Sequence, residues 1–70
     1  MANMKTVNLY IKNEFPNLKV EAVRGEGYVY FDGKDGFGKI DSIYVHPVST
    51  STTDLVEIVM ETLDDYERNL

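Results

Sequence analysis

The sequence predicts a small α+β domain, a two-layer sandwich in the order helix, three antiparallel strands, helix (αβββα). Three observations lead to this prediction. Apolar residues recur at intervals of three and four near both ends of the chain, as they do on one side of a helix. Between these segments apolar and polar residues alternate, as they do along half-buried strands. The chain has 70 residues, so residues 1–70 are expected to fold as a single α+β domain.

The first helix is predicted over residues 4–14. Pro16 disfavours helical geometry at the residue before it, so the helix is expected to end at residue 14. The side that this helix turns towards the core carries Met4, Val7, Ile11 and Phe15.

Two strands joined by a tight turn are predicted for residues 18–32. Glycine at the first central position makes Gly25-Glu26 typical of a type II′ hairpin turn. Such a turn places Arg24 opposite Gly27, and therefore Val23 opposite Tyr28. One face of the hairpin then collects the apolar residues Leu18, Val20, Ala22, Val29 and Phe31. The other face collects Lys19, Glu21, Val23, Tyr28, Tyr30 and Asp32.

The glycine-rich segment 33–38 is predicted to be a mobile, polar loop. A third strand is predicted over residues 39–46, and Pro47 ends it because proline cannot donate to a ladder. Ile43 and Val45 belong on the apolar face of this strand. Its other face is expected to carry Ile40, Ser42, Tyr44 and His46.

The last helix is predicted to start near residue 54 and to run to about residue 67. Ser51 followed by Asp54 resembles a capping box, with Asp in place of Glu. The two helices are expected to cover the same face of the sheet, because only one face is uniformly apolar, and to leave the other face open. The apolar stripe of the last helix carries Leu55, Ile58, Val59, Thr62, Leu63 and Tyr66.

Composition narrows the classes of function. Twelve acidic and seven basic residues give a net charge of −5, which disfavours binding to a phosphate backbone. The chain has no cysteine, which excludes disulfides and thiolate metal sites and fits a reducing compartment such as the cytosol. No apolar run approaches the length of a membrane span, so a cytoplasmic protein with no membrane contact is expected.

The open face of the sheet is the predicted partner-binding surface. Tyrosine offers a large amphipathic contact area and is enriched at protein interfaces. Two other interpretations stay open: a platform on which single-stranded bases stack, and ordinary tyrosines that only satisfy strand preference. The candidate binding residues are Tyr28, Tyr30 and Tyr44 together with Val23, Ile40, His46 and, on the neighbouring loop, Phe37.

A second candidate surface is the acidic side of the last helix. Acidic residues at helical spacing usually form a solvated face, and the alternative is a surface offered to a basic groove in place of phosphate. The residues concerned are Glu57, Glu61, Asp64 and Asp65.

No catalytic, metal or cofactor site is predicted. His46 is the only histidine. Ser42 could share its face, but strand spacing of about 6.6 Å separates their backbones, and no third, orienting group is evident. The acidic positions of segment 32–36 do not have the spacing of an EF-hand loop, and its glycines precede no helix that could hold a phosphate. The sequence therefore predicts a protein that is not an enzyme.

Segment 23–31 (Val-Arg-Gly-Glu-Gly-Tyr-Val-Tyr-Phe), then Ser42-Ile43-Tyr44-Val45 and an acidic helix, resembles small proteins carried by phages and mobile elements. The resemblance covers about residues 15 to 66, and proteins of this kind include inhibitors of bacterial defence such as anti-CRISPR proteins. It implies stoichiometric binding to a host protein or nucleoprotein complex, for example a CRISPR effector, in the host cytosol. The alternatives are a homodimer that pairs its tyrosine faces and, more weakly, a binder of single-stranded nucleic acid.

Overall fold

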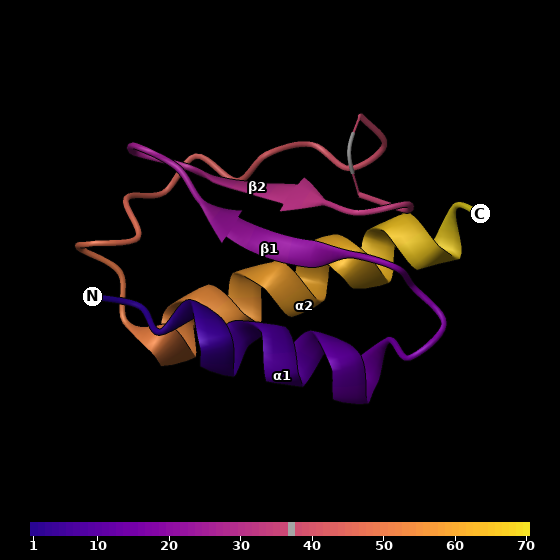
Figure 1. Ribbon diagram of the computed structural model, residues 1–70, viewed down its shortest axis with the longest axis horizontal. Helices are drawn as coiled ribbons and strands as arrows, with labels where there is room; N and C mark the ends of the chain where they lie inside the picture. Colours follow the sequence, from indigo (N-terminus) through magenta and orange to yellow (C-terminus); the bar gives the residue numbers. More distant parts are fainter. Residues whose placement is uncertain (37) are drawn as a thin grey trace.

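Two helices and one β-hairpin make up the fold. The computed structural model describes residues 1–36 and 38–70. Its elements are α1 (Met4–Glu14), β1 (Glu21–Arg24), β2 (Val29–Asp32) and α2 (Thr52–Arg68). Figure 1 shows both helices on the same face of the antiparallel hairpin, which confirms the α+β class and the two layers. Within the described ranges the sheet has two strands, and the third predicted strand is not formed.

α1 has the predicted bounds, and α2 begins two residues earlier and ends one residue later than predicted, because local sequence signals mark the helix ends. α1 begins after Asn3, whose side chain accepts a hydrogen bond from the N–H of Thr6, and it ends two residues before Pro16. The hydroxyl of Ser51 caps α2 by accepting from the N–H of Asp54 at 3.1 Å, as the capping-box pattern predicts.

The starts of the two helices lie next to each other, and the helices run in the same direction along the molecule (Figure 1). The N–H of Asn3 donates to the hydroxyl of Thr52 at 2.9 Å, which joins the cap of α1 to the first residue of α2. The N–H of Ala2 donates to the carbonyl of Pro47 at 2.9 Å, and Ala2 itself is buried. The first residues of the chain are therefore fixed to the segment that leads into α2.

The turn of the hairpin lies one residue later than predicted. The N–H of Gly25 donates to the carbonyl of Tyr28 at 2.9 Å, so Glu26 and Gly27 are the central residues. Gly27 has a φ of +78°, which puts the positive φ on the second central residue, whereas a type II′ turn requires it on the first. The predicted turn type is therefore wrong, although a two-residue turn is present.

This change moves the pairing of the strands by two residues. Val23 lies opposite Tyr30 rather than Tyr28, and Ala22 lies opposite Phe31. A shift of two residues returns each side chain to the face it would otherwise occupy, because side chains alternate with a period of two. The predicted division of the hairpin into an apolar and a tyrosine-bearing face is therefore retained even though the predicted register is wrong.

Residues 39–46 form a single β-bridge in place of the predicted strand. Val29 and Ile43 exchange two backbone hydrogen bonds of 2.8 Å each. Just before, the N–H groups of Lys39 and Ile40 both donate to the carbonyl of Gly36, so the chain is still turning at residue 40. Ile40 and Ile43 are both buried, a spacing of three that the alternation of an extended strand does not produce.

The first half of the glycine-rich loop is held in place, in contrast to the predicted mobility. The carboxylate of Asp35 accepts from the N–H of Lys19 at 2.6 Å, and the N–H of Asp35 donates back to the carbonyl of Lys19 at 3.0 Å. A Cβ on Gly33, whose φ is +100°, would lie 2.5 Å from that same carbonyl. Glycine is therefore needed here for both conformation and space.

The core lies between the hairpin and the two helices, and the apolar stripes predicted for both helices are confirmed. No side chain of the described residues is both buried and polar. None of the described helices combines the length and the apolar character that a membrane span needs. The buried hydrophobic residues of the core are Ala2, Val7, Ile11, Phe15, Ala22, Val29, Phe31, Ile40, Ile43, Leu55, Val59 and Leu63.

Candidate functional site

Three tyrosines meet on the outer face of the hairpin, as the sequence predicts. The ring centroids of Tyr28 and Tyr30 are 6.1 Å apart and those of Tyr28 and Tyr44 are 6.4 Å apart, with the planes tilted by 38° and 40°. These distances fall within the range in which aromatic rings attract each other. The three rings form one continuous cluster, with Tyr28 at its centre. We call the surface made by Tyr28, Tyr30 and Tyr44 the tyrosine face.

The backbone brings the third tyrosine to the other two. Because Val29 and Ile43 form an antiparallel bridge, the residues next to them, Tyr28 and Tyr44, lie opposite each other. Beneath Tyr28 the backbone of Gly25 leaves room for the ring, since a Cβ at that position would lie 2.4 Å from the ring carbon Cζ. One bridge and one glycine thus fix the cluster.

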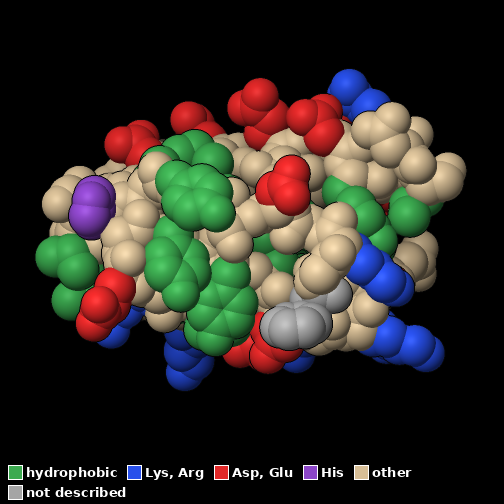
Figure 2. Space-filling model, turned by 90° about the horizontal axis from the view of Figure 1, so that it is seen from above, with side chains coloured by type: hydrophobic (Ala, Val, Ile, Leu, Met, Phe, Trp, Pro, Cys, Tyr) green, Lys and Arg blue, Asp and Glu red, His purple; other side chains and the backbone are tan. Residues whose placement is uncertain are grey.

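Much of the tyrosine face is open to solvent. Tyr44 is 83% exposed, whereas Tyr28 and Tyr30 are half-buried. Val23 is also half-buried and lies opposite Tyr30 in the hairpin, so it extends the apolar surface. Figure 2 views this side of the molecule and shows hydrophobic side chains in a row across it. The face is therefore an apolar patch that nothing in the chain covers among the described residues.

The other residues predicted for this surface differ in where they lie. His46 is exposed and lies beside the hairpin turn, where a Cβ on Gly27 would be 3.0 Å from its imidazole Cε1. Ile40 is only 9% exposed and belongs to the core, because the chain turns inward before residue 41. Ile40 nevertheless lines a hollow beside the three tyrosines, so its predicted role as a contact residue stays a prediction. Phe37 lies outside the described residues.

A shallow hollow of about 610 Å³ adjoins the rings. Its lining includes the three tyrosines and four residues of the following segment, Gly38, Ile40, Asp41 and Ser42. Asp41 is the charged residue in its lining, which also includes Phe31. The surface beside the rings is therefore concave, whereas the surface of a regular strand would be flat.

Charges at one end of the tyrosine face repel each other. Glu21 and Asp32 lie directly opposite in the hairpin, both are exposed, and they share the outer face with Val23 and Tyr30. Like charges in a directly opposed pair destabilise a sheet. A cationic group brought by a bound molecule would relieve that repulsion. The predominance of carboxylates here opposes a phosphate-bearing ligand.

The predicted acidic surface of α2 is divided between two sides of the helix. α2 carries six acidic residues and one basic residue. Glu57, Glu61 and Asp64 line a groove between the two helices, whereas Asp65 lines a separate hollow beside Lys39. Asp64 is paired with the guanidinium of Arg68 at 2.7 Å, on an exposed part of the helix. The four carboxylates therefore do not form one surface.

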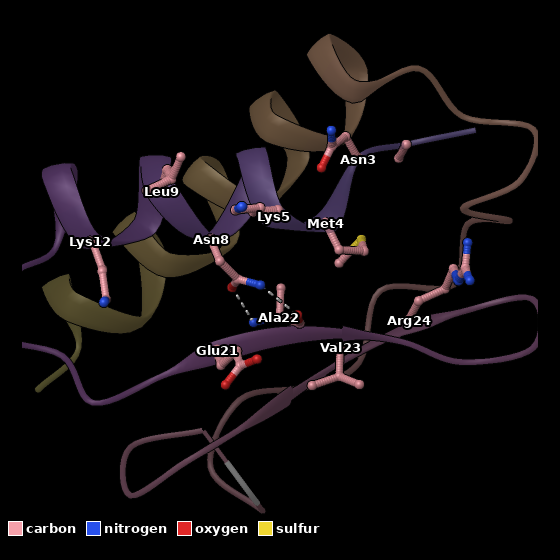
Figure 3. A pocket seen from close by; sticks show the side chains of 11 residues that line it. Asn3, Met4, Lys5, Asn8, Leu9, Lys12, Glu21, Ala22, Val23 and Arg24 are labelled. Atoms are coloured by element: carbon pink, nitrogen blue, oxygen red, sulfur yellow. Dashed lines mark hydrogen bonds between the residues drawn. The ribbon is translucent and has the colours of Figure 1, made fainter.

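A hollow of about 810 Å³ lies between α1 and β1 (Figure 3). Asn8 reaches across its floor: the side-chain amide donates to the carbonyl of Ala22 at 3.0 Å, and its oxygen accepts from the N–H of Ala22 at 2.8 Å. Asn8 thus pairs with the free edge of β1 as a neighbouring strand would, and it protects that edge from pairing with another chain. We assign this residue a structural role, which no sequence motif indicates.

Among the described residues, no group of three or more histidine, cysteine or acidic side chains is placed to hold a metal ion. No protein-family model, curated protein or solved structure matches the chain.

Proposed function

We propose that this chain is a non-catalytic protein-binding module and that the tyrosine face is its contact surface. The observation that carries the proposal is the clustering of three rings around Tyr28, with Tyr44 83% exposed. Single exposed apolar residues are common, whereas contiguous apolar patches usually mark interaction sites. Tyrosine is among the residues that contribute most to binding at such sites.

The charges around the rings favour a partner protein over the other occupants. In a symmetric dimer the same surface meets itself, so the carboxylates of Glu21, Asp32 and Asp41 would be shared by both sides of one interface. A nucleic acid would bring phosphates to the same carboxylates. A partner that presents apolar side chains to the rings and a basic residue to the Glu21–Asp32 pair complements both features.

The resemblance to phage-borne proteins gives this proposal a more specific form. In that form the protein acts in the bacterial cytosol as a stoichiometric inhibitor of a host defence complex, such as a CRISPR effector. The apolar, acid-rimmed tyrosine face supports a blocking role, because such a role needs a stable contact surface and no reaction chemistry.

Tyr44→Ala tests the contact surface without disturbing the fold, because the ring is exposed. The immobilised chain is used to capture partners from a bacterial host lysate, and each captured protein is then purified and titrated against the variants. We expect Tyr44→Ala to weaken binding by at least about 10-fold, as at an interface hot spot. Leu9→Ala, at an exposed apolar position on α1, is the matched control and should bind like the original chain.

Three results would contradict the proposal. A partner that binds the Tyr44→Ala and Leu9→Ala variants equally well would exclude the tyrosine face as the contact surface. A dimer in sedimentation at micromolar concentration that Tyr44→Ala converts to monomer would show that the face serves self-association. Tight binding of a labelled single-stranded oligonucleotide that Tyr44→Ala abolishes would show a base-stacking surface instead.

A further inference from the structure

The helical side of the molecule carries a second groove, which none of the proposed contacts of the tyrosine face involves. It lies between α1 and α2, has a volume of about 620 Å³ and is lined by residues of the two helices and Phe15 alone. Its apolar lining includes Tyr10, Val56 and Met60. Tyr10 is 47% exposed, and Val56 and Met60 are half-buried at the edge of the core. The groove therefore exposes apolar surface between two packed helices.

All charged residues that line this groove are acidic. Glu14 lies on the α1 side, and Glu57, Glu61 and Asp64 lie on the α2 side. Positions 57, 61 and 64 follow the i, i+4, i+7 spacing of one helix face and span about 10 Å along the axis. Asp64 already accepts a guanidinium, that of Arg68, at 2.7 Å. The groove thus combines an apolar floor with an anionic rim.

We propose that this groove binds a cationic amphipathic segment of a partner protein. The segment would place one or two apolar side chains between Tyr10 and Met60, and it would set lysine or arginine residues against Glu57 and Glu61. This is the arrangement by which an amphipathic helix occupies a hydrophobic groove, with charge complementarity selecting the partner. An anionic segment would meet four carboxylates and be repelled, so the charge of the rim defines the occupant.

The test uses a fluorescent peptide of about 12 residues, long enough for three helical turns, with lysine and leucine at helical spacing. A second peptide has serine in place of leucine, and a third has glutamate in place of lysine. Binding to the full chain is measured by fluorescence anisotropy at physiological salt and at about 1 M salt, where the Debye length falls to about 3 Å. We expect binding of the lysine–leucine peptide alone, and weaker binding at high salt.

Matched variants locate the site. The double variant Glu57→Gln/Glu61→Gln should weaken binding about 3- to 10-fold, because it removes two partly screened ion pairs. Asp65→Asn/Glu67→Gln changes the net charge by the same amount on the same helix, at positions outside the groove, and should leave affinity within about 2-fold. Tyr10→Ala should weaken binding by about 5-fold or more through loss of apolar contact.

Clear results would overturn the proposal. Equal binding of the lysine–serine peptide would show general attraction to an acidic protein, and equal losses in the two double variants would show that the groove is not the site. Absence of binding by the lysine–leucine peptide at millimolar concentration would also reject it. Tyr44→Ala should leave peptide affinity unchanged, so failure of this proposal is distinguishable from failure of the one for the tyrosine face.

Discussion

The β1–β2 hairpin and segment 39–46 have similar alternating sequences, yet only the hairpin forms strands. In the hairpin a two-residue turn brings the strands together, and four pairs of residues face each other. In segment 39–46 the pairing is limited to Val29 and Ile43. The difference arises at the start of the segment, because two backbone hydrogen bonds to Gly36 keep the chain turning through residue 40.

This contrast shows that alternation describes which residues are available for burial and not how far a strand extends. Ile40 and Ile43 are both buried because the chain bends between them. The single bridge is nevertheless sufficient to bring Tyr44 to Tyr28. A contact surface therefore needs only one correctly paired position in this segment.

The largest expected effect is on stability, where the hairpin should contribute more to the core than segment 39–46 does. Phe31 in β2 is 2% exposed and Ile43 in the bridge is 9% exposed. Phe31→Ala should lower the free energy of unfolding by about 3 to 5 kcal/mol, and Ile43→Ala by about 2 kcal/mol. Urea denaturation measures both, and an equal loss would show that the bridge segment supports the core as much as the hairpin does.

The next effect concerns the outer edge of the hairpin. Asn8→Ala leaves the N–H and carbonyl of Ala22 without their side-chain partner and should cost about 2 kcal/mol in unfolding free energy. Asn13→Ala, an exposed position of the same helix, reports the gain in helix propensity alone and serves as the control. If the two variants unfold at the same urea concentration, the contact with Ala22 does not stabilise the edge.

A smaller effect on stability is expected where the ring of Tyr28 packs on the backbone of Gly25. Gly25→Ala introduces a Cβ that overlaps the ring of Tyr28 and should cost about 1 kcal/mol. In a Tyr28→Ala background the added Cβ no longer meets a ring, and the same change should stabilise the strand end by a few tenths of a kcal/mol. A double-mutant cycle by urea denaturation measures the coupling, and a coupling near zero would contradict the packing of Tyr28 on Gly25.

The smallest effect on stability is expected at Tyr44, in segment 39–46. Tyr44→Ala should change the free energy of unfolding by no more than about 0.5 kcal/mol, since the ring is mainly in solvent. Tyr30→Ala, at a half-buried position opposite Val23, should cost about 1 kcal/mol. A loss above about 1 kcal/mol for Tyr44→Ala would mean that its ring supports the fold, and the interpretation as a contact residue would lose its main argument.

Local signals made much of this fold predictable. Pro16 and Ser51 mark helix ends through their own geometry, and both helices have the predicted apolar stripes. The face of each hairpin residue was also predicted, because a register shift of two residues preserves it. The grouping of Tyr28, Tyr30 and Tyr44 followed from the same alternation.

Features that depend on distant contacts were missed. Asp35 binds the backbone of Lys19, and Asn8 binds that of Ala22, across 16 and 14 residues of sequence. Neither pair has a motif, because any residue with a carboxylate or amide has the same capacity for hydrogen bonding. The groove beside Tyr10 likewise depends on how two helices meet, which periodicity in either helix alone does not determine.

The joined starts of α1 and α2 have a consequence for the dynamics of the chain. The N–H of Asn3 is hydrogen-bonded to Thr52 and the N–H of Ala2 to Pro47. Residues 2 and 3 therefore cannot detach while these hydrogen bonds to the beginning of α2 and to the segment that leads into it stay intact. Amide protons in the first turns of both helices are therefore expected to exchange with solvent through one shared opening event, at similar rates. A terminus that would otherwise be the first part to fray becomes part of the cooperative unit of the last helix.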